Sequence, residues 1–266
     1  MTIPNLPSFV DIHQNVLNAL NSGTPIVALE STIITHGMPF PDNAEMASSV
    51  EALIYDYGVV PATIAVIDGR IKIGLSPDEL MQLAKVKNAL KISRADMAFA
   101  ISQGKTAGTT VAATMIIARM VGIRIFATGG IGGVHKGAET TFDISADLTE
   151  LGKTDVLVVA AGAKAILDVP KTLEVLETQG VPVVGYKTNS LPAFWTKESD
   201  LDIPLRMDTT SEISDFLKVR DGLHLNSGIL VANPIPEKDE IPSKIINDYI
   251  QTAQTEMEND NISGKD

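Results

Sequence analysis

Short, nearly wholly apolar segments that alternate with stretches of helical periodicity constrain the fold of this chain more than any other feature. The apolar segments are Ile26–Glu30, Thr63–Ile67, Ile123–Thr128, Val156–Ala160, Val181–Gly185 and Gly228–Ala232. A strand with one face in water alternates apolar and polar residues, whereas a nearly continuous apolar run is typical of a parallel strand buried on both faces. We therefore predict an α/β fold with a three-layer α/β/α arrangement around a central, mostly parallel sheet.

The stretches between these segments carry helix signals at their ends. They predict helices over Phe9–Leu20, Asn43–Tyr57, Pro77–Lys85, Arg94–Ser102, Thr109–Val121, Lys171–Thr178 and Ser211–Val219. Ser76 followed by Glu79 forms a capping box, and Ser93 is a candidate N-cap. Asp68–Gly69 predicts a turn, after which Ile71–Leu75 returns as a short antiparallel strand. Since neither a repeat nor a low-complexity linker interrupts the chain, we expect one domain over residues 1–266.

Composition and charge narrow the class of protein. The chain has no cysteine, which excludes disulfides, zinc–thiolate sites, iron–sulfur clusters and thiol nucleophiles. Its net charge of −12 disfavours binding to nucleic-acid backbones. No apolar segment reaches the ~18 residues of a membrane span, and the N-terminus lacks the pattern of a signal peptide. We therefore expect a cytoplasmic protein that acts on a small molecule and has no nucleic-acid or membrane partner.

The residues that follow the strands are the first candidates for a site, because ligands bind beyond the carboxyl ends of parallel strands. Glu30 ends the first apolar segment, where a carboxylate is costly to bury unless it is paired or protonated. This setting suits a catalytic acid, but a structural pairing with a helix or a lysine fits it equally well. His36, a few residues later, is more typical of a loop histidine that braces the backbone.

A glycine-rich loop follows the third segment, with the sequence TGGIGGVH over residues 128–135. Its exposed backbone N–H groups can form a nest that binds an anion, although a flexible turn would look the same. His135 occupies the position of the third glycine of a dinucleotide fingerprint, which disfavours a nucleotide-dependent oxidoreductase.

Two further patterns have both a functional and an ordinary interpretation. Lys164 leaves the fourth segment through Ala160-Ala-Gly-Ala, so its amine could be desolvated and neutral, as a nucleophile requires, or could reach water as most lysines do. Asp143 and Asp147 are four residues apart and could share one face of a helix start, where they could bind a hard cation. Spacing alone favours ordinary acids near a helix N-terminus. Lys91 is a less informative case of the same kind as Lys164.

Long motifs in fixed order resemble the pseudouridine-5′-phosphate glycosidase family, also called the indigoidine synthase A-like family. The matching stretches are ALESTIITHGMPFPDN, VPATIAVIDGRIKIGL, KISRAD, GTTVAATMIIARMVGIRIFATGGIGGVH, TFDISADL, AGAKAILD, GVPVVGY, LPAFW and GILVANPIPE. They extend from about residue 25 to residue 240. Members of the family continue past the last residue of this chain, so the resemblance implies a single glycosidase domain that lacks the family's C-terminal helical segment and is weakened by its loss.

The resemblance implies reversible cleavage of the carbon–carbon glycosidic bond of pseudouridine 5′-phosphate to uracil and ribose 5-phosphate, as in nucleobase catabolism. The enzyme class implied is pseudouridylate synthase, a glycosidase grouped with the carbon–oxygen hydro-lyases. It further implies a Schiff base, Mn²⁺ or another divalent cation, and a homotrimer. The matching positions are Lys164 for the nucleophile, Glu30 for the proton donor, Lys91, Val111, Ser145, Ala146 and Asp147 for substrate contacts, and Asp143 for the metal.

The implied chemistry explains the residue types. Uracil that departs through carbon is a poor leaving group, so two carboxylates alone would not suffice, whereas a lysine can open the ribose ring and form an imine. Two alternatives stay open: a lyase or glycosidase for another ribosyl phosphate, and a catalytically impaired metabolite-binding protein.

Overall fold

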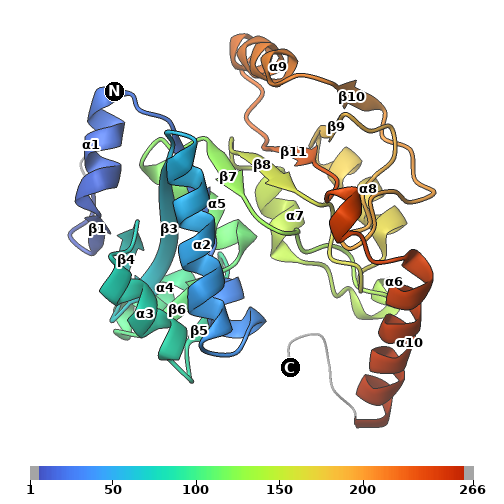
Figure 1. Ribbon diagram of the computed structural model, residues 1–266, viewed down its shortest axis with the longest axis horizontal. Coiled ribbons are helices and arrows are strands. Elements are labelled where there is room, and N and C mark those ends of the chain that lie inside the picture. Colours follow the sequence, from blue (N-terminus) through green and yellow to red (C-terminus); the bar gives the residue numbers. More distant parts are fainter. Residues whose placement is uncertain (1–5, 261–266) are drawn as a thin grey trace. The chain divides into compact units, whose positions relative to one another are not determined.

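A computed structural model describes residues 6–260 of the chain (Figure 1). Its internal contacts divide into two compact units, one up to Ala127 and one from Thr128 onward. Each unit combines parallel strands with helices. Among residues 6–260, no helix is both long and apolar enough to cross a membrane.

The first unit is built around β3 and its neighbours. Its elements are β1 (Val10–Ile12), α1 (Gln14–Ser22), β2 (Ile26–Leu29), the π-helix η1 (Ile33–Gly37), α2 (Asp42–Asp56), β3 (Val60–Ile67), β4 (Arg70–Ile73), α3 (Pro77–Lys85), β5 (Leu90–Ile92), α4 (Met97–Ser102), β6 (Ala107–Thr109), α5 (Val111–Met120) and β7 (Ile125–Ala127). The path through its strands is β1-β4-β3-β2-β7, with β6 on β3 and β5 on β6. Residues 61–67 of β3 are all buried, because α1, α2 and α5 pack against this strand.

The carboxyl ends of β2 and β6 meet end to end beside β3. β4 takes one edge of β3 at residues 64–67, so β6, which pairs at residues 65–66, must use the other edge. β2 occupies that same edge at residues 60–63. Because β2 runs parallel to β3 and β6 runs antiparallel to it, both strands end near Ile64, and the loops that leave them are brought together there.

The second unit has a wholly parallel set of paired strands. Its elements are α6 (Ala138–Thr141), α7 (Ala146–Leu151), β8 (Leu157–Ala160), α8 (Val169–Thr178), β9 (Val183–Tyr186), β10 (Leu205–Met207), α9 (Thr210–Gly222), β11 (Ile229–Ala232), the 3₁₀ turn η2 (Glu237–Asp239) and α10 (Ser243–Asp260). The order is β8-β11-β9-β10. The core strands β8 and β11 are almost entirely apolar, as burial on both faces requires.

The predicted α/β class with a mostly parallel sheet is confirmed, and helices lie on both sides of the strands (Figure 1). The capping box of Ser76 and Glu79 begins α3 as predicted. The N-cap predicted at Ser93 is wrong, because α4 begins after Asp96. The helix predicted from Phe9 begins only after His13, since the residues before it form β1. The expectation of one domain stays a prediction.

Candidate active site

Glu30 lies at the point where the chain leaves β2, as the sequence predicts. It is half-buried, and its carboxylate accepts a hydrogen bond from the hydroxyl of Thr32. The chain then winds into η1, a π-helical turn of a kind that is rare and frequently found at functional sites. Gly108 makes room for this turn, because a Cβ there would lie 2.2 Å from Thr35 Oγ1.

A chain of buried hydroxyl groups fastens the loop after Glu30 to the end of β6. The Thr109 hydroxyl donates to the Ile64 carbonyl at 2.7 Å, and a carbonyl can only accept. Thr109 Oγ1 must therefore accept from the hydroxyls of Thr114, at 3.0 Å, and Ser31, at 3.3 Å. Ser31 Oγ in turn accepts from the Thr109 N–H at 2.9 Å. Every bond in this chain thus has a fixed direction.

Lys91 and Val111 lie at the same end of this unit's strands as Glu30. Val111 is the first residue of α5 and is buried, and Thr110 caps the helix by accepting from the Ala113 N–H. Lys91, in β5, is exposed and is paired with Gly108 of β6. The first unit therefore brings together a carboxyl group, a lysine and a helix N-terminus, a combination suited to an anionic substrate that needs a proton.

The glycine-rich loop of the second unit is tied to the residues before α7. The Gly132 N–H donates to Asp147 Oδ2 at 2.8 Å, and the Ser145 N–H donates to the Gly133 carbonyl at 2.9 Å. A Cβ on Gly132 would lie 2.2 Å from Ser145 Oγ, so only glycine allows this approach. Ser145 caps α7, and Ala146, its first residue, is exposed. The predicted substrate-contact residues of this unit thus adjoin the loop.

Lys164 also adjoins the glycine-rich loop. Its N–H donates to the Ile131 carbonyl at 3.1 Å, while the Ile131 N–H donates to the Gly162 carbonyl at 3.1 Å. Gly162 has a φ of +93°, and a Cβ there would lie 2.3 Å from the Pro192 carbonyl oxygen. The Lys164 side chain is exposed in the single chain. The small residues before it shape a tight turn, and of the two alternatives left open by the sequence, Lys164 reaches solvent within the single chain.

Asp143 and Asp147 do not share a helix face, so the shared cation site that their spacing allowed is not formed. Asp143 lies two residues before the N-cap of α7, and the buried Asp147 lies inside the helix. Asp143 is near His135, with 3.9 Å between Oδ2 and Nδ1. Among residues 6–260 there is no group of three or more metal-ligating side chains. A carboxylate and an imidazole fit a largely hydrated divalent cation, which takes most of its ligands from water.

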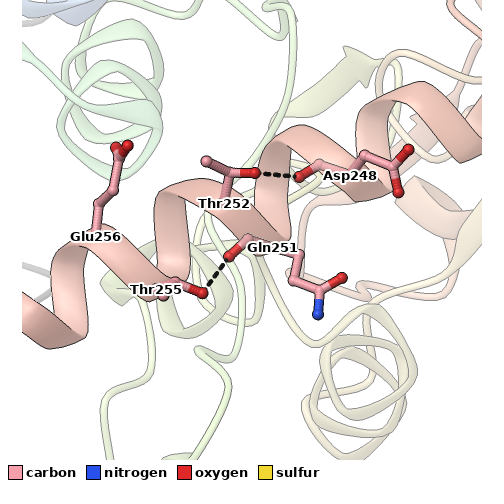
Figure 2. A pocket seen from close by; sticks show the side chains of 5 residues that line it. All are labelled: Asp248, Gln251, Thr252, Thr255 and Glu256. Carbon is pink, nitrogen blue, oxygen red and sulfur yellow. Dashed lines mark hydrogen bonds between the residues drawn. The ribbon is translucent and has the colours of Figure 1, made fainter.

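A shallow depression beside α10 lies apart from these residues in the sequence and does not suit a sugar phosphate (Figure 2). Its lining comes from one helix and consists of Asp248, Gln251, Thr252, Thr255 and Glu256. The two threonine hydroxyls donate to carbonyls one turn earlier, at 2.9 Å each, and the two acids would repel an anion.

The sequence predicted candidate catalytic residues at the ends of β2 and β8. It did not predict the residues whose hydrogen bonds fix the loops next to these candidates. Ser31 and Thr109 have no distinctive local pattern; the available signal is only that a small hydroxyl residue lies near the end of each of two strands. The glycine-rich loop was recognised, yet its partner in the fold turned out to be the Asp147 carboxylate.

Comparisons with known proteins agree along almost the whole chain. The family described as "Indigoidine synthase A like protein" matches residues 15–266. A pseudouridine-5′-phosphate glycosidase from Dinoroseobacter shibae is 74% identical over 261 residues, covering 98% of this chain and 86% of that protein. A protein of the same name from Mesorhizobium japonicum is 61% identical over 257 residues, covering 97% of this chain and 84% of that protein.

Two solved structures are also similar to the chain. The prealnumycin C-glycosynthase AlnA, in complex with ribulose 5-phosphate, has a TM-score of 0.89 and 37% identity, over 97% of this chain and 84% of that one. An indigoidine synthase A-like protein from Thermotoga maritima has a TM-score of 0.85 and 32% identity, over 94% of this chain and 82% of that one.

Proposed function

The chain belongs to the indigoidine synthase A-like family, and from that premise we propose that it is a pseudouridine-5′-phosphate glycosidase. It cleaves the bond between uracil C5 and ribose C1′, giving uracil and ribose 5-phosphate. The observation that carries the proposal is the 74% identity over 98% of the chain to a relative of that name. The reverse reaction would make it a synthase, and loss of water in that direction accounts for grouping it with the hydro-lyases.

Lys164 is the proposed nucleophile. Its amine forms a bond to C1′ while the bond from C1′ to the ring oxygen breaks, and that oxygen takes a proton. Uracil C5 is protonated next, and the nitrogen lone pair then expels uracil to leave an imine at C1′. Water hydrolyses the imine, which releases ribose 5-phosphate and restores the amine. The exposure of Lys164 supports this role, because the substrate can reach the amine.

Glu30 is the proposed proton donor, and the remaining residues hold the substrate. The half-buried setting of Glu30 after β2 suits a carboxyl group that exchanges a proton. Lys91 and the N-terminus of α5 at Val111 offer positive charge to an anion. Ser145, Ala146 and Asp147 contact the substrate from the segment tied to the glycine-rich loop. Binding the remote phosphate would supply energy for positioning C1′.

A divalent cation, with Mn²⁺ as the first candidate, would be held by Asp143. When bound, the ion would supply positive charge to the phosphate or sugar oxygens. His135, 3.9 Å from the Asp143 carboxylate, would orient that group. We also propose a homotrimer and a cytoplasmic location.

The test is an assay of uracil release from pseudouridine 5′-phosphate, with and without Mn²⁺. We expect release that depends on the metal. The second candidate function, a lyase for another ribosyl phosphate, is favoured by the similarity to AlnA, a C-glycosynthase. Parallel assays with uridine 5′-phosphate separate the two, and faster cleavage of this nitrogen-linked substrate would overturn the proposed specificity.

A further inference from the structure

Lys91 and the η1 turn face each other across Gly108. Lys91 is registered with Gly108 in the parallel pair of β5 and β6, and registered residues project from the same face of a sheet. A Cβ on Gly108 would meet Thr35 Oγ1 at 2.2 Å. Thr35 therefore lies on the face from which the Lys91 side chain projects.

His36 is fixed beside this lysine by contacts at its ring. Its Nδ1 is 2.7 Å from Thr35 Oγ1, and a second hydrogen bond joins the ring to the backbone of Ala89, two residues before Lys91. Partial burial of the imidazole, and then the charge of Lys91, lower the pKa of His36 below its ordinary value. The lowered pKa favours the neutral imidazole at pH 7, and His36 is exposed to solvent.

Lys91 is the charged group that acts on His36. η1 packs against α2, α3 and β6. The ionisable side chains on those elements are Asp42, Glu45, Glu51, Tyr55 and Asp56 of α2, and Asp78, Glu79 and Lys85 of α3. Of these, Glu79 pairs with Lys72, Glu51 bonds Thr63, and Lys85 lies over the Phe40 ring at 5.3 Å.

We propose that His36 and Lys91 form one anion subsite, in which His36 takes up a proton from solvent when a phosphate monoester binds to Lys91. The bound anion neutralises the lysine, so the part of the pKa lowering of His36 that comes from the charge of Lys91 is removed. The imidazolium then adds a second positive charge beside the phosphate. The identity of the anion as the 5′-phosphate rests on the proposed function, whereas the coupling between the two residues does not.

The protonation of His36 and the binding of the anion are thermodynamically linked. If binding raises the pKa of His36, then a fall in pH must tighten binding to the same extent. We expect ribose 5-phosphate to bind about three- to tenfold more tightly at pH 6 than at pH 8 in the wild type, relative to His36→Gln. The glutamine keeps hydrogen-bonding atoms but does not titrate, and the phosphate's own ionisation cancels in the comparison.

The experiment is a proton NMR titration of the histidine Cε1–H signals in the full chain. The chain has 4 histidines, so the loss of one signal in His36→Gln assigns it. We expect the pKa of His36 to rise in Lys91→Met without ligand, and to rise in the wild type with saturating ribose 5-phosphate or inorganic phosphate. In Lys91→Met the ligands should no longer move it.

The pKa of His36 tests the anion subsite, and uracil release tests the proposed function separately. An unchanged pKa of His36 in Lys91→Met would overturn the coupling, and ribose 5-phosphate that binds without moving His36 would overturn the subsite while leaving the function intact. If uracil release fails but Lys91→Met and inorganic phosphate still move His36, the proposed function is wrong and the subsite stands.

Discussion

The Thr109 N–H donates to Ser31 Oγ at 2.9 Å, and this buried bond joins two residues that are 78 positions apart in the sequence. Ser31 follows Glu30, and Thr109 is two residues before Val111, so the bond holds the proposed acid and the N-terminus of α5 in one arrangement. Since the carboxyl ends of β2 and β6 meet here, the fold itself creates the contact.

Replacing Thr109 with valine tests how much this bond network stabilises the first unit. Thr109→Val keeps the shape but leaves the buried Ile64 carbonyl without the hydroxyl donor. It also removes the acceptor of Ser31 and Thr114. We expect the free energy of unfolding to fall by about 2–4 kcal/mol, measured by urea denaturation. Thr109→Ser restores the hydroxyl and should recover most of the loss; equal instability of the two variants would contradict this account.

Two glycines of the same loop offer a matched pair of substitutions. In Gly132→Ala, the new Cβ would meet Ser145 Oγ at 2.2 Å and Asp147 Oδ2 at 2.7 Å, so both side chains must move. In Gly129→Ala, the nearest atom lies 3.8 Å away, on Phe194. We expect kcat/KM for pseudouridine 5′-phosphate to fall at least about tenfold in Gly132→Ala and less than about threefold in Gly129→Ala. Similar losses in both would show that the approach of Gly132 to Asp147 is unimportant.

Acid should destabilise the first unit through Asp11. A bidentate contact with Arg70, at 2.5 and 2.6 Å, lowers the pKa of Asp11 to about 2, and Lys72 adds to the effect. Because the folded pKa lies below the unfolded value, the stabilisation is present above about pH 4 and is lost as the pH falls toward 2. Both partners are partly exposed, so we expect only ~1 kcal/mol. Asp11→Asn should lose this part of the pH dependence between pH 4 and 2, as measured by denaturation at each pH; an unchanged slope would contradict it.

The strands that sequence patterns predicted best are those buried on both faces. β3, β8 and β11 are almost wholly apolar, which is the pattern of a strand buried on both faces. β5 and β6 were missed because they are only 3 residues each, and Ala107-Gly108-Thr109 has no intrinsic preference for a strand. These two strands form because they pair with each other and because β6 pairs with β3. The sequence predicted a helix over the residues of β1. β1 forms a strand only because it pairs with β4, which is distant in the chain.

The site shows the same division between local and long-range information. Glu30 could be located because it directly follows an apolar run, and Lys164 because it follows small residues. The bond from Thr109 to Ser31 depends on how strands separated in the chain come together, which no local pattern records. Asp143 and Asp147 do not share a helix face because α7 begins at Ala146, between them.

Metal binding should depend on Asp143 more than on Asp147. The Asp147 carboxylate is buried and accepts from the Gly132 N–H, whereas the Asp143 side chain is 38% exposed and faces His135. We expect Asp143→Asn to weaken Mn²⁺ binding at least about tenfold, measured from the electron paramagnetic resonance signal of free Mn²⁺. Asp147→Asn should change Mn²⁺ affinity less than Asp143→Asn does. The reverse order would contradict the assignment.

Lys164 should form a covalent imine with ribose 5-phosphate. Its backbone is held to Ile131 of the glycine-rich loop by a 3.1 Å hydrogen bond, and its amine is exposed, so an open-chain aldehyde can reach it. Borohydride reduces an imine to a stable amine, which would lock one sugar phosphate onto the chain. We expect mass spectrometry of the reduced protein to show a single adduct and peptide mapping to assign it to Lys164.

Three variants make this test specific to Lys164. Lys164→Ala should abolish the adduct and uracil release together. Lys171→Ala changes another exposed lysine of the same unit, which pairs with Glu139 and Asp168, and should leave the adduct unchanged. Lys91→Met should weaken ribose 5-phosphate binding, yet still form the adduct at saturating sugar phosphate. An adduct that persists in Lys164→Ala and maps to Lys91 would assign the nucleophile to Lys91 instead, and an active enzyme that never forms an adduct would exclude the imine.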